Sequence, residues 1–226
     1  MPAEPPALAL LAAPPLMWRV EYLSPPLRFS RINAVDARLE SGNRFDIAGA
    51  GVLYAATEPV GAYAETLASF RPSSSLLAKL ATFPAEAGRL APGVVEQAWR
   101  LNRRLRSLRV REALPFIDID DPRTHTYLTH AAATQLNEMN VGNLDVAQVR
   151  GPSRLLTRAI ATWIYSQTDE HGQPLYSGIR YESRFGDYEC WAIFDGTRVE
   201  AVDESTIERF SPELRQIESA FGLTIM

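Results

Sequence analysis

The chain has 226 residues, of which 46% are hydrophobic and 22% are charged, and both values are ordinary for a globular protein. Its net charge of −4 supplies no positive field to gather phosphates, so direct binding of nucleic acid is not expected. The sequence predicts no membrane span, because no apolar run reaches the required length. Its single cysteine, Cys190, excludes an internal disulfide framework and suits a cytoplasmic protein.

The first 16 residues are expected to form a proline-rich arm, followed by one domain over residues 17–226. Proline fixes φ and removes an amide donor, which favours a semi-extended chain. The arm contains Pro5, Pro6, Pro14 and Pro15. The apolar run from Ala7 to Ala13 lacks the basic residues that precede the core of a signal peptide, so no signal peptide is predicted.

The first part of the chain predicts two strands and a helix. Residues 18–22 alternate large apolar and charged side chains, as a half-buried strand does. Residues 30–51 are rich in Asn, Ser, Gly and Asp and indicate a loop, whereas residues 52–56 form a short apolar run typical of an interior strand. A helix is expected from Pro59, a residue that suits the first helical turn, to Phe70.

Apolar periodicity in the rest of the chain predicts further helices and strands. Helices are expected over residues 94–108, 122–136, 153–167 and 212–221. Strands are expected over residues 116–120, 178–181 and 189–194. The apolar segment from Leu76 to Phe83 favours neither type. This order of elements fits an α+β fold with one mixed β-sheet and flanking helices.

Several familiar patterns of functional sites are missing from the sequence. His125 and His130 are five residues apart and fall on different sides of a helix, and there is no Cys-x-x-Cys, so no protein-bound metal is expected. The glycine-rich loops of nucleotide-binding folds and the Gly-x-Ser-x-Gly elbow of serine hydrolases are also absent. The sequence therefore predicts no bound cofactor.

A run of arginines lies between residues 100 and 111. Its members are Arg100, Arg103, Arg104, Arg106, Arg109 and Arg111. In an acidic protein such a run could bind nucleic acid, an acidic partner or phosphates. We favour the commoner interpretation, which is a solvated helix face paired with nearby carboxylates.

Five residues spread along the chain are candidates for a functional site. They are Arg19, Arg44, Tyr54, Glu65 and Ser183. Most also have an ordinary structural explanation: a strand charge facing water for Arg19, a core ring with a bonded hydroxyl for Tyr54, and a solvated helix position for Glu65. Ser183 could simply be a turn residue. Spacing alone assigns none of them to a site.

The order of short motifs around these residues resembles the RES-domain family. The motifs are Trp18-Arg19-Val20, Asn43-Arg44-Phe45-Asp46, Val52-Leu53-Tyr54-Ala55-Ala56, Ala62-Tyr63-Ala64-Glu65, the segment from Gly178 to Arg184 and Trp191-Ala192-Ile193-Phe194. The resemblance covers residues 17–195 and is loose over residues 71–150. Its most specific parts run from Tyr54 to Glu65 and from Tyr181 to Arg184.

This resemblance implies a fold, an activity and a partner. The family is named for an arginine, a glutamate and a serine, which Arg19, Glu65 and Ser183 match best; Arg28 and Arg31 remain alternatives for the arginine. Members are similar to ADP-ribosyltransferase toxins and cleave NAD at the nicotinamide–ribose bond, as toxins paired with a separate helix-turn-helix antitoxin protein. The alternatives are a mono-ADP-ribosyltransferase that modifies a protein target and a non-enzymatic interaction module.

The candidate side chains suit that chemistry. Nicotinamide leaves as a neutral group, and the transition state resembles an oxocarbenium ion at the ribose. Arg19 and Arg44 carry guanidinium groups suited to phosphates, and the ring of Tyr54 could stack on nicotinamide. Glu65 could stabilise the developing positive charge or orient water. Ser183 could position nicotinamide, the ribose or Glu65 by a hydrogen bond. NAD enters this scheme as a substrate, and no metal is required.

Overall fold

The computed structural model describes residues 7–39, 41–82 and 92–226. The strands of its main sheet are β1 (Leu10–Leu11), β2 (Met17–Tyr22), β3 (Ser30–Arg31), β4 (Gly51–Ala56), β6 (Arg103–Arg111), β7 (Phe116–Asp118), β8 (Gly178–Glu182), β9 (Glu189–Phe194) and β10 (Arg198–Thr206). Their order is β1-β7-β8-β9-β4-β2-β6-β10, with β3 beside β4. β7 and β8 are parallel, and the other neighbours are antiparallel. β5 (Val94–Val95) and β11 (Thr224–Ile225) form a separate parallel pair.

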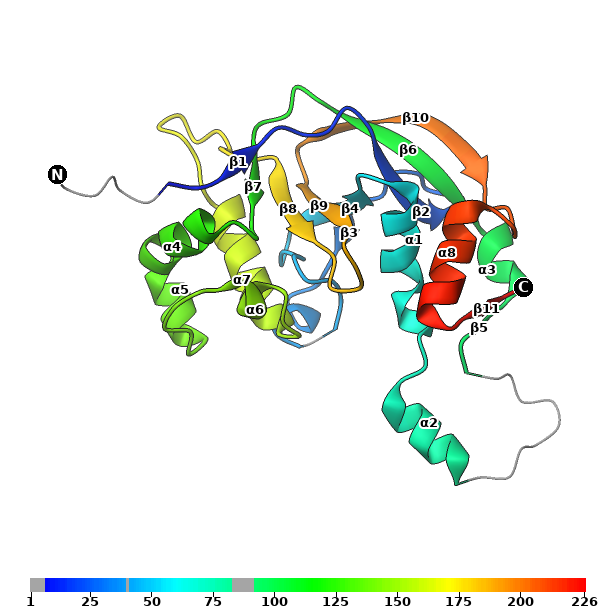
Figure 1. Cartoon of the computed structure of the whole chain (residues 1–226). Helices are drawn as coiled ribbons and strands as arrows, with labels where there is room; N and C mark the ends of the chain where they lie inside the picture. The colour runs from blue at the N-terminus through cyan, green and yellow to red at the C-terminus, as the bar shows by residue number, and fades with distance from the viewer. Residues whose placement is uncertain (1–6, 40, 83–91) are drawn as a thin grey trace.

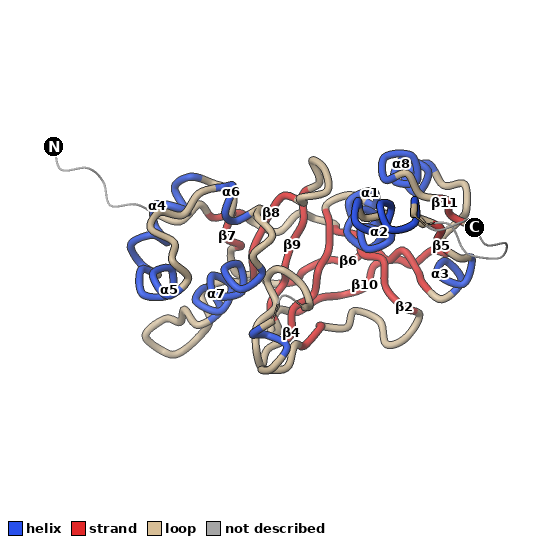
Figure 2. The backbone as a smooth tube through the Cα atoms, turned by 90° about the horizontal axis from the view of Figure 1, so that it is seen from below, coloured by secondary structure: helices blue, strands red, loops and turns tan. Residues whose placement is uncertain are grey.

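The helices lie on one side of this sheet (Figure 1). They are α1 (Pro59–Leu67), α2 (Ser74–Ala81), α3 (Gln97–Leu101), α4 (Pro122–Ala131), α5 (Ala133–Glu138), α6 (Val146–Val149), α7 (Arg154–Tyr165) and α8 (Pro212–Phe221), with 3₁₀ turns η1 (Asp36–Arg38) and η2 (Ala68–Phe70). Figure 2 shows α4 to α7 at one end of the sheet and α1, α3 and α8 at the other. The α+β fold with a mixed sheet and flanking helices is therefore confirmed. In the described parts of the chain, no helix is long and apolar enough to cross a membrane.

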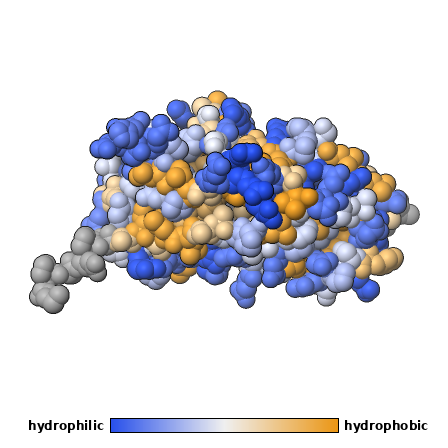
Figure 3. Space-filling model, turned by 90° about the horizontal axis from the view of Figure 1, so that it is seen from above, coloured by the Kyte–Doolittle hydropathy of each residue, from blue (hydrophilic) through white to orange (hydrophobic). Residues whose placement is uncertain are grey.

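Both faces of the sheet are apolar. The larger core lies between the sheet and the helices. A second cluster on the other face contains Met17, Leu53, Ala55, Leu108, Phe116, Trp191 and Ile193. The N-terminal segment crosses over that side (Figure 1), and Figure 3 shows apolar patches between polar side chains there. Leu10 and Leu11, from the expected arm, pair with β7, whereas residues 1–6 of the arm lie outside the described residues.

Small residues let α1 pack closely on the sheet. The helix begins at Pro59, as expected, with Glu58 as its N-cap. A Cβ atom at Gly61 would lie 2.9 Å from the Cβ of Ala56, closer than side chains normally approach. This face of α1 carries little side-chain volume. The next turn of the helix, with Glu65 and Thr66, can therefore lie close to strand β4.

The predicted helix over residues 153–167 is confirmed as α7. Leu156, Ile160 and Ile164 are buried, as the apolar stripe predicts. Two polar residues, Thr157 and Arg158, are buried on the same helix. Buried polar groups need partners, so these two side chains must be bonded to neighbouring segments.

The helix predicted over residues 94–108 is wrong for most of that segment. Only α3 is helical, and the chain continues as strand β6. Leu105 belongs to the core beneath the helices, and Leu108 belongs to the cluster on the opposite face. Because both faces of this strand are buried, apolar residues occur at odd and even positions, and their spacing of three imitates a helix.

The helix-face interpretation of the arginine run is wrong for the same reason. Most of the run lies on β6, and its partners lie on neighbouring segments. The side chains of Arg106 and Glu21 are joined by a hydrogen bond of 2.6 Å, and Arg111 is bonded to Glu200 at 2.7 Å. Arg103 instead lies over a ring of β2, 4.1 Å from its centroid. Pairing with carboxylates therefore holds for part of the run, across strands rather than along a helix.

Several other segments were left open or missed, among them the short strands β3 and β11. Of the ambiguous segment from Leu76 to Phe83, residues up to Ala81 belong to α2, and Phe83 lies outside the described residues. Strand β10 was not predicted at all. Its residues are mostly exposed at the edge of the sheet, so they carry no apolar alternation that would reveal a strand.

The strand assignment of β6 makes a stability prediction. Leu101 and Leu108 are seven residues apart, so one helix would bury both on the same face. In the structure Leu101 is 59% exposed and Leu108 is fully buried. We expect Leu108→Ala to lower the free energy of unfolding by about 2–5 kcal/mol. Leu101→Ala should change it by less than about 0.5 kcal/mol in denaturant titrations. Equal losses would contradict the assignment.

Candidate active site

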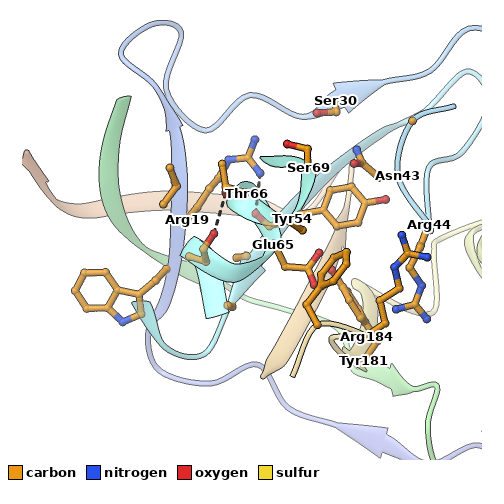
Figure 4. Close-up of a pocket in the computed structure, with 18 of the residues that line it drawn as sticks. Arg19, Ser30, Asn43, Arg44, Tyr54, Glu65, Thr66, Ser69, Tyr181 and Arg184 are labelled. Atoms are coloured by element: carbon orange, nitrogen blue, oxygen red, sulfur yellow. Dashed lines mark hydrogen bonds between the residues drawn. The ribbon is translucent and has the colours of Figure 1, made fainter. Parts of the chain in front are cut away.

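A cavity of about 500 Å³ opens beside α1 and the strands β2 and β4. Four of the five candidate residues line it: Arg19 from β2, Arg44 from the loop before β4, Tyr54 from β4 and Glu65 from α1. Figure 4 shows Glu65 between Arg19 on one side and Arg44 and Arg184 on the other. The site is therefore a carboxylate flanked by guanidinium groups.

The fifth candidate, Ser183, does not line the cavity but is bonded to Glu65, which does. Its hydroxyl donates a hydrogen bond of 2.5 Å to Oε1 of Glu65 and accepts one of 3.1 Å from the backbone NH of Phe185. Ser183 is only 5% exposed, and its own NH bonds to the carbonyl of Tyr188 across the turn. The hydroxyl is thus fixed in direction, and it fixes the carboxylate in turn.

Burial governs the protonation of Glu65. It raises the pKa of this carboxyl above the ordinary value of 4.5. The hydrogen bond from Ser183 and the charges of Arg44 and Arg184 act in the opposite direction and lower the pKa, without cancelling the effect of burial. A positive charge placed beside Glu65 would therefore be attracted more strongly than beside an exposed carboxylate, because burial leaves the ionised group poorly hydrated.

Arg44 is the side chain best placed to receive an anion. Its guanidinium lies 5.1 Å from the ring centroid of Phe45 and 5.3 Å from that of Tyr181, and Nη2 donates to the carbonyl of Val149. Its Nε and Nη1 atoms are buried and lack a hydrogen-bond partner in the described structure. A buried unsatisfied donor costs about 1–3 kcal/mol, so an anionic oxygen that reached these atoms would be bound favourably.

Arg19 is held more tightly than Arg44. Its Nε donates to Oε2 of Glu21 at 3.0 Å, and its Nη1 donates to the carbonyl of Tyr54 at 2.7 Å. Glu21 also accepts hydrogen bonds from Arg106 and from the backbone NH of Leu27. The charge of Arg19 is thus largely compensated, and its guanidinium is fixed against the wall of the cavity.

Tyr54 presents its ring rather than its hydroxyl. The hydroxyl donates to Oδ1 of Asp46 at 2.9 Å and accepts from the NH of Phe45 at 3.1 Å. Burial, reinforced by Asp46, raises the pKa of this phenol well above its ordinary value. The residue therefore supplies a neutral ring face to the cavity and ties the neighbouring loop to β4.

Sequence reasoning found part of the lining and missed the rest. Arg31 pairs with Asp195 at 2.6 Å, and neither it nor Arg28 lines the cavity, so Arg19 is the early arginine that does. Lining residues that were not predicted include Asn43, Arg154, Tyr181, Arg184 and Phe185. Most of these residues lie within two positions of Arg44 or Ser183, so closeness in sequence to a predicted residue is the feature that could have identified them. Arg154 lies in α7, where nothing in the local sequence marks it.

Comparison with protein-family models decides the family. The model of the RES domain matches residues 16–214, which is most of the chain. The chain belongs to the RES-domain family. The structure of this RES-domain protein is also similar to a chain in the crystal structure of the M. tuberculosis MbcT–MbcA toxin–antitoxin complex, with a TM-score of 0.50. The match covers 94% of this chain and 92% of that one at 10% identity, so it shows the fold alone. A search of curated proteins finds no match.

The raised pKa of Glu65 predicts a pH dependence of stability. Between the ordinary carboxyl pKa and the raised one, the folded state keeps a proton that the unfolded chain has released. The stability that this proton gives is complete below about pH 4 and is lost as the pH rises through the raised pKa. We expect the Tm of Glu65→Gln to increase relative to the parent over that interval.

Glu200 supplies a control of opposite sign. The hydrogen bond from Arg111 holds the pKa of this partly exposed carboxyl below 4.5. Its contribution is therefore present above the ordinary pKa and is lost as the pH falls. The Tm of Glu200→Gln should decrease relative to the parent as the pH rises. Parallel pH profiles of the two variants would show that Glu65 is not buried as described.

Proposed function

We propose that this RES-domain protein is an enzyme that cleaves NAD between nicotinamide and ribose, and that it acts as the toxin of a toxin–antitoxin pair. The observation that carries the proposal is the pairing of Glu65 with Ser183 beside a cavity that Arg44 also lines, with two buried nitrogen atoms of Arg44 left without a hydrogen-bond partner in the described structure. NAD needs an anion site for its phosphates and a carboxylate beside its ribose. This cavity offers both.

In the proposed reaction, the bond between the ribose C1′ and the nicotinamide nitrogen breaks, and nicotinamide leaves with the electron pair as a neutral molecule. The ionised carboxylate of Glu65 stabilises the positive charge that develops at the ribose. The burial that raises the pKa of Glu65 also strengthens this interaction, because a poorly hydrated carboxylate has few competing partners. Water then bonds to C1′ and loses a proton to Glu65 or to solvent, which gives ADP-ribose.

The other side chains hold the substrate or the carboxylate. Arg44 and Arg184 bind the phosphates in this proposal, and the ring of Tyr54 packs against nicotinamide. Arg19, already bonded to Glu21, contributes a guanidinium that is fixed against the wall of the cavity. Ser183 acts through Glu65, since its hydroxyl is already bonded there.

The proposed partner is a separate helix-turn-helix antitoxin protein. Two observations support it: the chain belongs to the RES-domain family, and its fold is similar to a chain from a toxin–antitoxin complex. We propose a cytoplasmic setting, where NAD is present.

A direct assay tests the proposed cleavage. The purified protein should release nicotinamide from NAD, as followed by chromatography. Glu65→Gln should lower kcat by about 10²–10³-fold, because it removes the charge that stabilises the transition state. Glu58→Gln is the matched control, since Glu58 is exposed at the start of the same helix, and it should retain the activity of the parent. A folded parent without nicotinamide release would overturn the proposal.

The acceptor of ADP-ribose is tested separately. If water is the acceptor, mass spectrometry should find free ADP-ribose equal in amount to the nicotinamide released, and no adduct on added protein. ADP-ribose attached to protein side chains would instead identify a mono-ADP-ribosyltransferase. The same measurement with and without phosphate reports on phosphate as acceptor.

A further inference from the structure

The loop that carries Arg44 is built around a buried arginine on α7. Arg158 is 4% exposed, and among the described residues its hydrogen bonds all go to backbone carbonyls, those of Asp36, Ala37, Leu39, Ser41 and Asn43. Its Nε donates to Asn43 at 3.1 Å, and its Nη1 donates to Leu39 at 2.6 Å. It has no carboxylate partner among the residues that the structure describes. One guanidinium therefore sets the path of the loop.

Thr157, the preceding residue of α7, holds Arg44 itself. Its hydroxyl donates a hydrogen bond of 2.5 Å to the carbonyl of Arg44, and the residue is fully buried. At the tip of the same side chain, Nη2 of Arg44 donates to the carbonyl of Val149, the last residue of α6. Arg44 is thus fixed at its backbone and at its side-chain tip by the same region of the chain.

The loop also has little room to take another path. Gly42 has φ +77, and a Cβ atom there would lie 2.8 Å from Oδ2 of Asp46 and 3.1 Å from Nη2 of Arg158. Asp46 in turn accepts hydrogen bonds from the NH of Asn43 and from the hydroxyl of Tyr54. Arg158 braces this loop without touching the substrate cavity, which it does not line.

We propose that Thr157 and Arg158 are positioning residues that set the affinity of Arg44 for the phosphate part of the substrate. The inference rests on the proposed function, because it takes Arg44 as the phosphate-binding side chain. The two α7 residues act on binding and leave bond cleavage, which belongs to Glu65, unchanged. Fixing a guanidinium before the ligand arrives raises affinity, because less motion is lost on binding.

The first experiment compares conservative variants at these two positions. Thr157→Val keeps the shape of the side chain and removes the hydroxyl. Arg158→Lys keeps the charge but replaces the planar fork of three nitrogen atoms, all of which donate here, by a single ammonium nitrogen. Thr157→Val should weaken ADP-ribose binding by about 3–10-fold and raise KM for NAD similarly. Arg158→Lys should weaken binding by more than about tenfold. Both should leave kcat within about twofold of the parent.

Matched controls separate this effect from a general loss of structure. Thr162→Val is the control for Thr157→Val, because Thr162 is exposed on α7. Arg215→Lys is the control for Arg158→Lys, because Arg215 is exposed on α8. Both controls should bind ADP-ribose as the parent does in calorimetry. If Arg158→Lys fails to fold, Thr157→Val carries the test, because its volume is unchanged. A lower Tm for Thr157→Val with unchanged binding would make its role merely structural and overturn the inference.

A double-mutant cycle tests the route through Arg44. In an Arg44→Met background, Thr157→Val should weaken ADP-ribose binding by less than about twofold, because the side chain that it positions is gone. Independent effects that multiply would overturn the inference. A parent that binds ADP-ribose through Arg44 but does not cleave NAD would overturn the proposed function alone. A parent that does neither would overturn both.

Discussion

The hydrogen bond between Ser183 and Glu65 joins residues that are 118 positions apart in the chain. It depends on the order of the sheet, in which β9 pairs with β4 on one side and with β8 on the other. α1 follows β4 directly, and the turn between β8 and β9 carries Ser183, so the order of three strands brings the carboxylate to the hydroxyl. The small residues of α1 complete the approach. Most of the remaining site is arranged around this contact.

Several charged side chains near the cavity are held in chains of partners rather than in isolated pairs. Arg150 bonds to Asp120 at 2.7 Å and to Glu182 at 2.6 Å, and Glu182 immediately precedes Ser183. The neighbouring carbonyl, that of Val149, accepts the bond from Arg44. Val149 and Arg150, which are consecutive, therefore support both Arg44 and the end of β8 that precedes Ser183. Removing one member of such a network leaves its buried neighbours unpaired, which is why these networks are sensitive to substitution.

The sequence predicted elements with a distinctive pattern, either a one-sided apolar stripe or a short apolar run bounded by turn residues, as in β4. α7 was predicted because its apolar stripe is one-sided, whereas β6 was mistaken for a helix because it is apolar on both faces. The candidate residues from Arg19 to Ser183 were selected through short motifs, not through spacing. Arg158 gave no signal, since a charged residue beside an apolar stripe usually points to water. Its burial depends on a loop more than 100 residues earlier, and only the folded chain shows it.

The unsatisfied nitrogen atoms of Arg44 have a consequence for the lifetime of the protein. A ligand that satisfies them binds only the folded state, and at a hundred times its Kd it adds about 2.7 kcal/mol to stability. On the proposed function that ligand is NAD, so the enzyme consumes the molecule that protects its own fold. As NAD falls, more of the chain would open to proteases, and the damage would limit itself even without an antitoxin.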